Sequence, residues 1–352
     1  MSPDLGGLEL YMAKASLFLN NTFNVITVIN KNSKLEPYLK DKVEYKIIKK
    51  TSNVFMLRSA KKLAKVIDDE DIDLIHLHWT KDIPFVVLAK LFSKKKPKVV
   101  QSRHMTMTRY KNDFYHNFLY KNIDLILPVT EQVKEQLIKF IPSHIRPNIE
   151  VLYIGADEVK EQEEFLLNTT GFNIGIVGRI NRDKGQYLLI EAVSILREKG
   201  LDIYAHIVGS PMQESYLLEL QDQVKEKKLQ GRVSFLGFVN NPQAFYRACD
   251  VIVLASKKET FGLVLVEAMK VGVSVIGANS GGVVEIIDNK ETGLLFESQN
   301  AESLSQSIEL LYNDEVLKES IAKKGQIKSN TLFSNILQFP KLIEIFKREL
   351  EC

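Results

Sequence analysis

Short apolar runs alternate with longer amphipathic runs along nearly the whole chain. The apolar runs are typical of buried strands. In the first half the predicted strands are Phe23–Ile29, Glu44–Ile48, Asp73–His78, Lys98–Gln101, Asp124–Val129 and Glu150–Tyr153. In the second half they are Phe172–Val177, Ile203–Val208, Val233–Leu236, Val251–Leu254, Ser274–Ile276 and Gly293–Phe296. The amphipathic runs predict helices, among them Arg58–Asp69, Glu131–Phe140, Gly185–Lys199, Glu214–Lys227 and Ala301–Tyr312.

The regular alternation of strands and helices predicts the fold class. Continuously apolar strands separated by helices indicate parallel sheets that are covered on both faces. Because the two halves repeat this arrangement, we expect an α/β protein with two doubly wound, Rossmann-like domains that face a central cleft. We expect the domains at residues 1–155 and 156–330, joined through a Glu-rich polar stretch. Residues 331–352, interrupted by Pro340, are expected to form a helix that crosses back to the first domain.

The predicted first domain begins in an unusual way. A doubly wound domain opens with a buried strand that leads into its first glycine turn. Here the pair Gly6-Gly7 follows only Met1–Leu5, and Pro3 and Asp4 make this segment a poor buried strand. We therefore expect that roughly ten residues of upstream sequence, with the first strand of this domain, are missing from the sequence.

Length and composition exclude several classes of protein. A chain of 352 residues suggests two domains, at about 150 residues each. Hydrophobic residues make up 45% and charged residues 26%, which argues against disordered, collagen-like and disulfide-scaffold chains. No apolar run approaches the roughly 20 residues of a membrane span, and the acidic N-terminus does not resemble a signal peptide. Cys249 and Cys352 form no disulfide framework, so a reduced, cytoplasmic chain is expected.

Charge is distributed unevenly between the two halves. Residues 1–150 carry 25 Lys and Arg against 16 Asp and Glu, whereas residues 151–352 carry 22 against 28. A basic half suits an anionic membrane surface, such as the inner face of the cytoplasmic membrane, at about 1 kcal/mol per basic residue near the headgroups. The alternative is an ordinary solvated surface. Neither zinc-finger spacing nor an RNP-like aromatic motif occurs, so no nucleic-acid partner is expected.

The strongest motif follows the predicted strand Val251–Leu254 and runs from Glu259 to Met269. A strand, a short loop with Gly262 and a new helix form an anion cradle, because the first N–H groups of a helix are unpaired and its dipole favours negative charge. Glu259 and Glu267 flank this cradle, and carboxylates accept hydrogen bonds from the vicinal hydroxyls of a ribose or a sugar. The alternative is that Glu259 only caps the helix and Glu267 lies on its polar face.

A second motif consists of Gly178-Arg179 and Lys184-Gly185, around the end of the strand Phe172–Val177. Ligands bind at the carboxyl ends of strands in open parallel sheets. Arg and Lys together neutralise a diphosphate without a metal ion. The alternative is surface charge at the start of a helix, although a cation there opposes the helix dipole.

Other candidates are weaker when taken alone. Gly6-Gly7 forms a further predicted strand-to-helix turn, and Ser280-Gly281-Gly282 with Glu285 forms a flexible turn in the second half. His104 follows the strand Lys98–Gln101, where it faces the cleft or has only a structural role. The acidic run 68–73 is interpreted as a solvated helix end rather than a metal site. Metal-ligand spacing, Gly-x-Gly-x-x-Gly and a P-loop are all absent from the sequence.

In ordered combination, these residues resemble the retaining glycosyltransferases of the family 4 type (glycosyl transferases group 1), which have a GT-B fold. The resemblance covers nearly the whole chain and is densest from Gly171 to Phe296. Ile154-Gly155 departs from the family's usual Asn-Gly at the linker. The residues that carry the resemblance are Gly6–Glu9, Gly178-Arg179, Lys184-Gly185, Val233–Gly237, Glu259 with Glu267, Gly281-Gly282 with Glu285, and Thr292–Leu295.

The resemblance implies an activity. Such enzymes move a sugar from a nucleotide-diphosphate sugar to a saccharide or lipid-linked acceptor with retention of configuration, as in the synthesis of cell-surface polysaccharide or lipopolysaccharide. The second domain would hold the donor, and no metal or other cofactor would be needed. The implied catalytic residues are His104, Arg179, Lys184 and Glu259.

The resemblance also implies individual roles. Arg179 and Lys184 would hold the donor diphosphate, and Glu259 would bind hydroxyls of the transferred sugar. Glu267 would bind the ribose, and His104 would contact the donor sugar or assist at the reaction centre. Phe261, Gly262 and Leu263 would offer backbone N–H groups to the phosphates, and Gly237, Phe238 and Val239 would lie along the nucleobase, partly through backbone bonds. Gly6 and Gly7 would approach the donor phosphates or the acceptor, and Thr260 is a further implied donor-site residue.

Two other functions fit the same fold class. A nucleotide-sugar epimerase of similar architecture would convert the donor sugar without an acceptor, and it would need further acid and base residues in the cleft. A non-catalytic nucleotide-sugar-binding subunit would bind the donor without turnover. Retention of Arg179 and Lys184 together with Glu259 and Glu267 argues against the second alternative.

Overall fold

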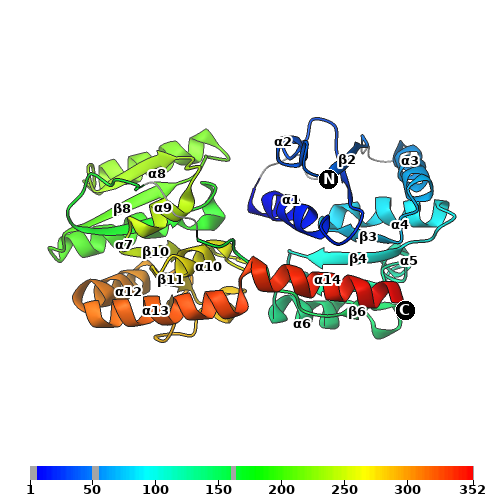
Figure 1. Cartoon of the computed structure of the whole chain (residues 1–352). Helices are drawn as coiled ribbons and strands as arrows, with labels where there is room; N and C mark the ends of the chain where they lie inside the picture. The colour runs from blue at the N-terminus through cyan, green and yellow to red at the C-terminus, as the bar shows by residue number, and fades with distance from the viewer. Residues whose placement is uncertain (1–5, 50–54, 160–163, 352) are drawn as a thin grey trace. The chain divides into compact units, whose positions relative to one another are not determined.

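The computed structural model describes residues 6–49, 55–159 and 164–351 of the chain (Figure 1). The expectations about Met1–Leu5, about part of the joining stretch (160–163) and about Cys352 lie outside these residues. The chain divides into two compact units. The first unit contains Met1–Tyr153 and Gln338–Cys352, and the second contains Ile154–Leu337.

The first unit contains six described strands, arranged in two parallel sheets. One sheet pairs β1 with β2, and the other has the order β3-β4-β5-β6. All pairings within these sheets are parallel, as the sequence pattern predicts. The strands are β1 (Ile26–Ile29), β2 (Glu44–Ile47), β3 (Leu74–Leu77), β4 (Lys98–Arg103), β5 (Leu125–Pro128) and β6 (Asn148–Ile149).

The predicted strand Glu150–Tyr153 is wrong, because β6 ends at Ile149. The reason lies in its neighbour β5, which ends at Pro128. The Leu152 N–H still donates to the Pro128 carbonyl at 3.0 Å. Pro128 has no N–H to return, so the ladder stops there.

Helices cover both faces of the larger sheet in the first unit. Val99 and Val100 are neighbours on β4, yet they belong to different hydrophobic clusters, which therefore lie on opposite faces. One cluster includes residues of α3 and α4, and the other includes residues of α1 and α14. The helices are α1 (Gly7–Leu19), α2 (Glu36–Leu39), α3 (Phe55–Asp69), α4 (Ile83–Phe92), α5 (Phe114–Tyr120) and α6 (Glu131–Phe140), with short 3-10 turns at Thr80–Asp82 and Ser143–Ile145.

The second unit contains one parallel sheet of six strands with the order β12-β11-β10-β7-β8-β9. From β7 the chain builds outward through β8 and β9, and it then returns to place β10 on the other side of β7. The strand order therefore reverses between β7 and β10, which is where doubly wound sheets bind ligands. The strands are β7 (Phe172–Val177), β8 (Ile203–Val208), β9 (Val233–Gly237), β10 (Val251–Leu254), β11 (Ser274–Ala278) and β12 (Leu294–Phe296).

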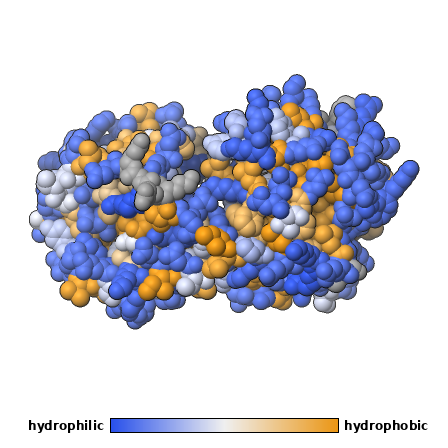
Figure 2. All heavy atoms as spheres, in the orientation of Figure 1, coloured by the Kyte–Doolittle hydropathy of each residue, from blue (hydrophilic) through white to orange (hydrophobic). Residues whose placement is uncertain are grey.

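Helices and a continuous apolar core surround this sheet. Fully buried strand residues such as Ile174 and Val253 share one cluster with Leu189 of α7 and Leu304 of α12. On the face drawn in Figure 2, hydrophilic side chains cover most of each unit. The helices are α7 (Gln186–Glu198), α8 (Glu214–Glu226), α9 (Pro242–Arg247), α10 (Leu263–Lys270), α11 (Val283–Ile286), α12 (Ala301–Asn313) and α13 (Glu315–Leu332), with a 3-10 turn at Arg182–Lys184.

The two chain segments that cross between the units are joined within the second unit. The last helix, α14 (Asn335–Glu351), begins in the second unit and belongs to the first from Gln338 onward. Ala156 donates to the Phe333 carbonyl at 2.7 Å, and Asn335 donates back to the Ala156 carbonyl at 3.0 Å. The buried Lys270 ammonium bonds both Glu158 and Ser334. These contacts fix the two crossing segments side by side.

Candidate functional site

The best-defined site lies at the point in the second unit where the strand order reverses. Because β7 and β10 are parallel neighbours, the loops that follow them emerge side by side. Lys184, after β7, donates from Nζ to Glu259 Oε2, after β10, at 2.8 Å. The structure thus brings together two predicted site residues that are 75 positions apart in the sequence.

The two loops also touch through their backbones. Gly185 has a left-handed conformation (φ 75°), and a Cβ atom there would lie 2.2 Å from the Ala255 carbonyl oxygen. The Lys257 N–H donates to the Asp183 carbonyl at 2.8 Å. Only glycine fits this approach, so the backbone itself fixes the position of Lys184 relative to Glu259.

Helix α10 begins beside this ion pair. Gly262 (φ 100°) precedes the helix, and no side chain caps it. Glu259 Oε1 accepts a hydrogen bond from the N–H of Thr260 at 3.2 Å, and Thr260 lies before the helix begins. Glu259 therefore does not cap α10, contrary to the alternative interpretation. The predicted turn at Gly281-Gly282 contacts this loop, because the Gly282 N–H donates to the Glu259 carbonyl at 2.9 Å. The helix thus presents N-terminal N–H groups next to a cation and a carboxylate.

Glu267 lies one turn into α10 and accepts a hydrogen bond from the Tyr246 hydroxyl at 2.8 Å. Tyr246, on α9, is completely buried. Burial, and secondarily the charge of Glu267, raises the pKa of Tyr246 far above its usual range. Tyr246 therefore stays protonated and holds the carboxylate in place. The sequence does not identify Tyr246 as a site residue, because a single Tyr in a short helix with apolar neighbours is typical of a hydrophobic core.

Three of the other predicted residues of the second unit are exposed, namely Arg179, Gly237 and Phe238. Arg179 lies two residues after the end of β7. Gly237 ends β9, and its carbonyl accepts from Gly209 at 2.7 Å, while the Phe238 side chain is 72% exposed. Because β9 lies two strands from β7, the end of β9 is about 10 Å along the sheet edge from the end of β7.

His104 in the first unit is part of a histidine cluster rather than a lone side chain. It follows β4, and its Nε2 lies 3.1 Å from Nδ1 of His78, which follows β3. The ring of His76 is 4.1 Å from that of His78, and Tyr11 of α1 meets both His78 and His104 edge-on. The His-x-His pattern at the end of a strand was the available signal for His78.

The histidine cluster is uncharged at neutral pH. Burial lowers the pKa of both His76 and His104 to about 3, and it lowers the pKa of His78 as well. Within the described part of the chain, the buried Nδ1 atom of His104 has no hydrogen-bond partner. Such an atom costs about 1–3 kcal/mol unless a ligand or water satisfies it.

The loop that carries His104 is held by the neighbouring arginine. The buried Arg103 guanidinium donates from Nε to the Met105 carbonyl at 2.7 Å and from Nη1 to Thr80 Oγ1 at 2.9 Å. These bonds tie the end of β4 to the turn after β3. Arg103 is therefore a positioning residue for His104, and sequence reasoning did not identify it.

Gly6 and Gly7 stand at the start of α1. The helix begins at Gly7, and the Gly6 carbonyl accepts from the Leu10 N–H at 3.1 Å. Gly6 itself is extended (φ −155°), a conformation open to any residue. The predicted turn therefore opens a helix, and the residues before it lie outside the described part of the chain.

Two searches of the described residues gave negative results. Across 6–49, 55–159 and 164–351, no group of three or more His, Cys, Asp or Glu side chains has an arrangement that could hold a metal ion. Over the same ranges, no helix is both long and apolar enough to span a bilayer. The acidic run instead makes structural contacts, since Asp68 accepts from Ser93 Oγ at 2.6 Å and Asp73 pairs with Lys95.

Two known protein families match the chain. Residues 157–328 match the family described as "Glycosyl transferases group 1", and residues 4–130 match the one described as "Glycosyl transferase 4-like". The first match spans the ion pair, α10 and Tyr246, and the second spans the histidine cluster. Both matched families are described as glycosyl transferases.

Relatives across the length of the chain are also glycosyltransferases. The capsular polysaccharide biosynthesis glycosyltransferase CapM of Staphylococcus aureus is 26% identical, over 94% of this chain and 97% of that protein. An N-acetylgalactosaminyltransferase of Campylobacter jejuni, named for a diphospho-undecaprenol-linked acceptor, is 26% identical over 77% of this chain and 75% of that protein. The structure of Anabaena Alr3699/HepE in complex with UDP has a TM-score of 0.86 at 19% identity and covers 99% and 98% of the two chains. That likeness shows the predicted fold, GT-B.

The Gly185 contact generates the first prediction. Gly185→Ala places a methyl group against the Ala255 carbonyl and forces a left-handed conformation on alanine. We expect it to destabilise the second unit by about 2–4 kcal/mol. Gly200→Ala is the matched control, because Gly200 has a similar φ of 83° but nothing within 4 Å of the new methyl group. Denaturant unfolding should give a loss of about 1 kcal/mol for the control; equal losses would show that the close approach has no role.

The histidine cluster generates a second prediction, which concerns how stability depends on pH. The folded chain keeps His76 and His104 neutral down to a pKa of about 3, whereas unfolded histidines titrate near about 6.5. The unfolded state therefore binds more protons in this window, and stability falls as the pH drops from 6.5 toward 3. His104→Asn should reduce the slope of unfolding free energy between pH 6 and 5 by about 1.4 kcal/mol per pH unit. An unchanged slope would mean that His104 titrates normally in the folded protein.

Proposed function

We propose that this glycosyltransferase moves a sugar from a nucleotide-diphosphate sugar to a saccharide or lipid-linked acceptor, with retention of anomeric configuration. The observation that carries the proposal is the Lys184–Glu259 ion pair beside the N-terminus of α10. It supplies a cation, a hydroxyl acceptor and unpaired N–H groups at one point of the sheet edge. We further propose a role in cell-surface polysaccharide or lipopolysaccharide synthesis, as the name of CapM supports.

The donor diphosphate is proposed to bind between Arg179, Lys184 and the first N–H groups of α10. As the anomeric bond breaks, negative charge grows on the departing diphosphate, and fixed cations and oriented N–H groups stabilise that charge. Both cations are side chains of the protein, so donor binding is expected without a divalent metal. Phe261, Gly262 and Leu263 would contribute through their backbone only.

The nucleoside and the sugar are proposed to contact the two glutamates. Glu267, held by Tyr246, would accept hydrogen bonds from the ribose hydroxyls. Glu259 would accept from hydroxyls of the transferred sugar, while Gly237, Phe238 and Val239 lie along the base. We propose UDP as the first nucleotide to test, since Alr3699/HepE was crystallised with it.

For His104 we propose a hydrogen-bonding role at the reacting sugar. Its Nδ1 atom, which has no partner among the described residues, can donate or accept a hydrogen bond. Because burial lowers the pKa of His104 to about 3, the ring is a poor general base. We therefore assign the acceptor proton to a phosphate oxygen of the leaving group. In this front-face reaction the acceptor oxygen bonds the anomeric carbon on the side from which the diphosphate departs, through an oxocarbenium-like state.

The first unit offers a surface for a lipid-linked acceptor. Between β4 and the end of α5, Tyr110, Tyr115 and Phe118 are exposed, and Phe114 is 89% exposed. Arg109 and Lys111 lie in the same segment, and aromatic rings with nearby cations suit an anionic lipid interface. We propose that this aromatic segment, residues 105–118, contacts an anionic membrane surface. The C. jejuni relative, named for a diphospho-undecaprenol-linked acceptor, supports this choice.

The nucleotide site generates a binding prediction. In a thermal-shift panel of UDP, GDP, ADP and CMP without metal, one nucleotide should raise Tm, because a ligand at 100 times its Kd adds about 2.7 kcal/mol to stability. Arg179→Ala should abolish the shift, while Arg247→Ala, a cation at the end of α9, should keep it. No shift with any nucleotide, in a chain that melts cooperatively, would contradict the proposal.

Product analysis then separates the alternatives. A transferase incubated with donor alone only hydrolyses it slowly, and a retaining enzyme gives an α-linked product from an α-linked donor. An epimerase would convert the donor sugar without an acceptor. Binding without turnover across donors and acceptors would favour the non-catalytic subunit.

The aromatic segment generates a membrane-binding prediction. The chain should sediment with anionic liposomes at low salt and less at high salt, because salt screens the basic residues. Phe114→Ser should reduce binding several-fold, as it removes a large interfacial ring. Val316→Ser, a 79% exposed position on α13, is the control and should not change binding. Equal binding by the two variants would exclude the aromatic segment as the contact.

A further inference from the structure

The chain leaves the second unit twice, and both exits lie at one junction within that unit. The two crossing segments are residues 154–158 and 333–337. A short parallel bridge joins them at Ala156 and Ser334, and two backbone hydrogen bonds run between the segments. The position of each exit therefore depends on the other.

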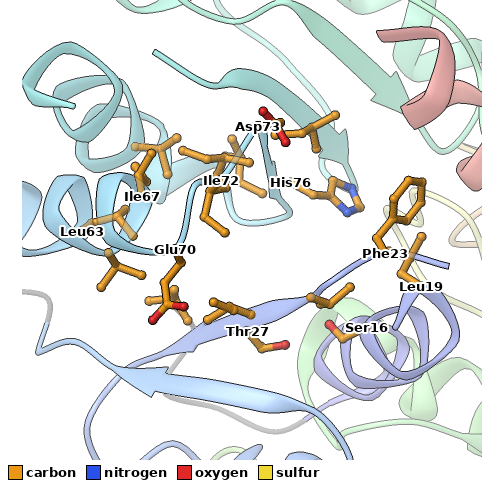
Figure 3. Close-up of a pocket in the computed structure, with 18 of the residues that line it drawn as sticks. Ser16, Leu19, Phe23, Thr27, Leu63, Ile67, Glu70, Ile72, Asp73 and His76 are labelled. Atoms are coloured by element: carbon orange, nitrogen blue, oxygen red, sulfur yellow. The ribbon is translucent and has the colours of Figure 1, made fainter. Parts of the chain in front are cut away.

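The junction is closely packed. A Cβ atom on Gly155 would lie 2.5 Å from the backbone nitrogen of Asn335, and the Asn335 amide donates from Nδ2 to Asp157 Oδ1 at 2.7 Å. The first unit shows the opposite case, an apolar cavity of about 370 Å³ that is lined by Thr27 and His76 (Figure 3). Close packing carries a displacement from one segment to its neighbour, whereas an open cavity does not.

The C-terminal end of α10 is bound to both crossing segments. Lys270 is the last residue of this helix, and its side chain is completely buried. Its ammonium group pairs with the half-exposed Glu158 carboxylate on one segment and donates to Ser334 Oγ on the other at 3.2 Å. A buried ammonium group is strongly unfavourable without such partners. Lys270 therefore holds the end of α10 to both exits.

The N-terminal end of α10 contacts the same junction. The buried ring of Phe261, which precedes the helix, meets the buried ring of Phe333 edge-on, with 5.7 Å between the ring centroids. Phe333 is also the residue whose carbonyl accepts from the Ala156 N–H across the junction. The crossing segments thus touch both ends of the helix at which the donor diphosphate is proposed to bind.

We propose that α10 and the crossing segments open as one cooperative unit, so that a nucleotide bound at the start of α10 stabilises the junction through which the chain leaves the second unit. Lys270 and Phe333 are the links. They are positioning residues, because they act through α10 rather than on the donor itself. This inference rests on the proposed donor site, and it adds that donor binding strengthens the connection toward the first unit.

Amide hydrogen exchange measures this cooperativity. A ligand that binds only the closed form slows every opening that breaks its site, by about 100-fold at 100 times its Kd. The N–H groups of Ala156 and Asn335, which bond across the junction, report on its opening. If the junction opens together with α10, the nucleotide slows their exchange. If the two open independently, their exchange rates stay unchanged.

Three variants are compared with the wild-type chain. Lys270→Met replaces the buried ammonium group with an apolar side chain, and Glu158 is exposed enough to stay hydrated, so the fold should be kept. Phe333→Leu removes the ring contact at the other end of α10. Lys199→Met is the matched control, because it breaks an ion pair with Glu309 on a different helix of the same unit.

The probe is UDP at 100 times its Kd, replaced by GDP, ADP or CMP if the thermal-shift panel selects one of these. In the wild-type chain and in Lys199→Met, it should slow exchange at Ala156 and Asn335 by about tenfold or more. Lys270→Met and Phe333→Leu should bind the nucleotide with unchanged Kd by calorimetry and keep its protection of α10. Each should lose most of the slowing at Ala156 and Asn335.

The outcomes separate this inference from the proposed function. Nucleotide binding without slower exchange at the junction would overturn the inference and leave the donor site intact. Equal slowing in all three variants would overturn the roles of Lys270 and Phe333. If Lys270→Met does not fold, Phe333→Leu decides between the same two results. If the wild-type chain binds none of the four nucleotides, the proposed function fails, and the inference fails with it.

Discussion

The ion pair between Lys184 and Glu259 depends on one constraint, the reversal of strand order between β7 and β10. The two side chains belong to loops that only this reversal places side by side. A half-buried ion pair is worth little if its geometry is loose, since desolvation offsets the attraction. The glycine contact at Gly185 fixes that geometry through the backbone, so the fold itself determines where the two side chains lie.

The two units differ in how continuous their described sheets are. The second has six strands in one sheet, a continuous core and a site whose charged groups are already paired. The first has a divided sheet, an apolar cavity and a buried histidine nitrogen without a partner among the described residues.

The sequence was most informative where strands are buried on both faces. Such strands read as continuous apolar runs, and β7, β8 and β10 have the predicted bounds. It was less informative about β6, whose length is limited by Pro128 of the neighbouring strand β5. It also gave no prediction for α4, because this helix is too uniformly apolar to show a helical period. Lys184 and Glu259 could be predicted from their motifs. Tyr246 could not, because it holds Glu267, which only the fold brings near, and Arg103 could not, because its contact with Thr80 depends on the fold. For His78 the only signal was the His-x-His pattern.

The most direct test of the central claim is a crystal structure of the chain with UDP and no divalent metal. The account predicts the diphosphate at the N-terminus of α10, within hydrogen-bond distance of Arg179 and Lys184, with the ribose on Glu267. It also predicts that Lys184 turns at least partly from Glu259 toward the phosphate. A diphosphate bound elsewhere, or one that contacts neither cation, would contradict the claim that the β7–β10 reversal forms the donor site.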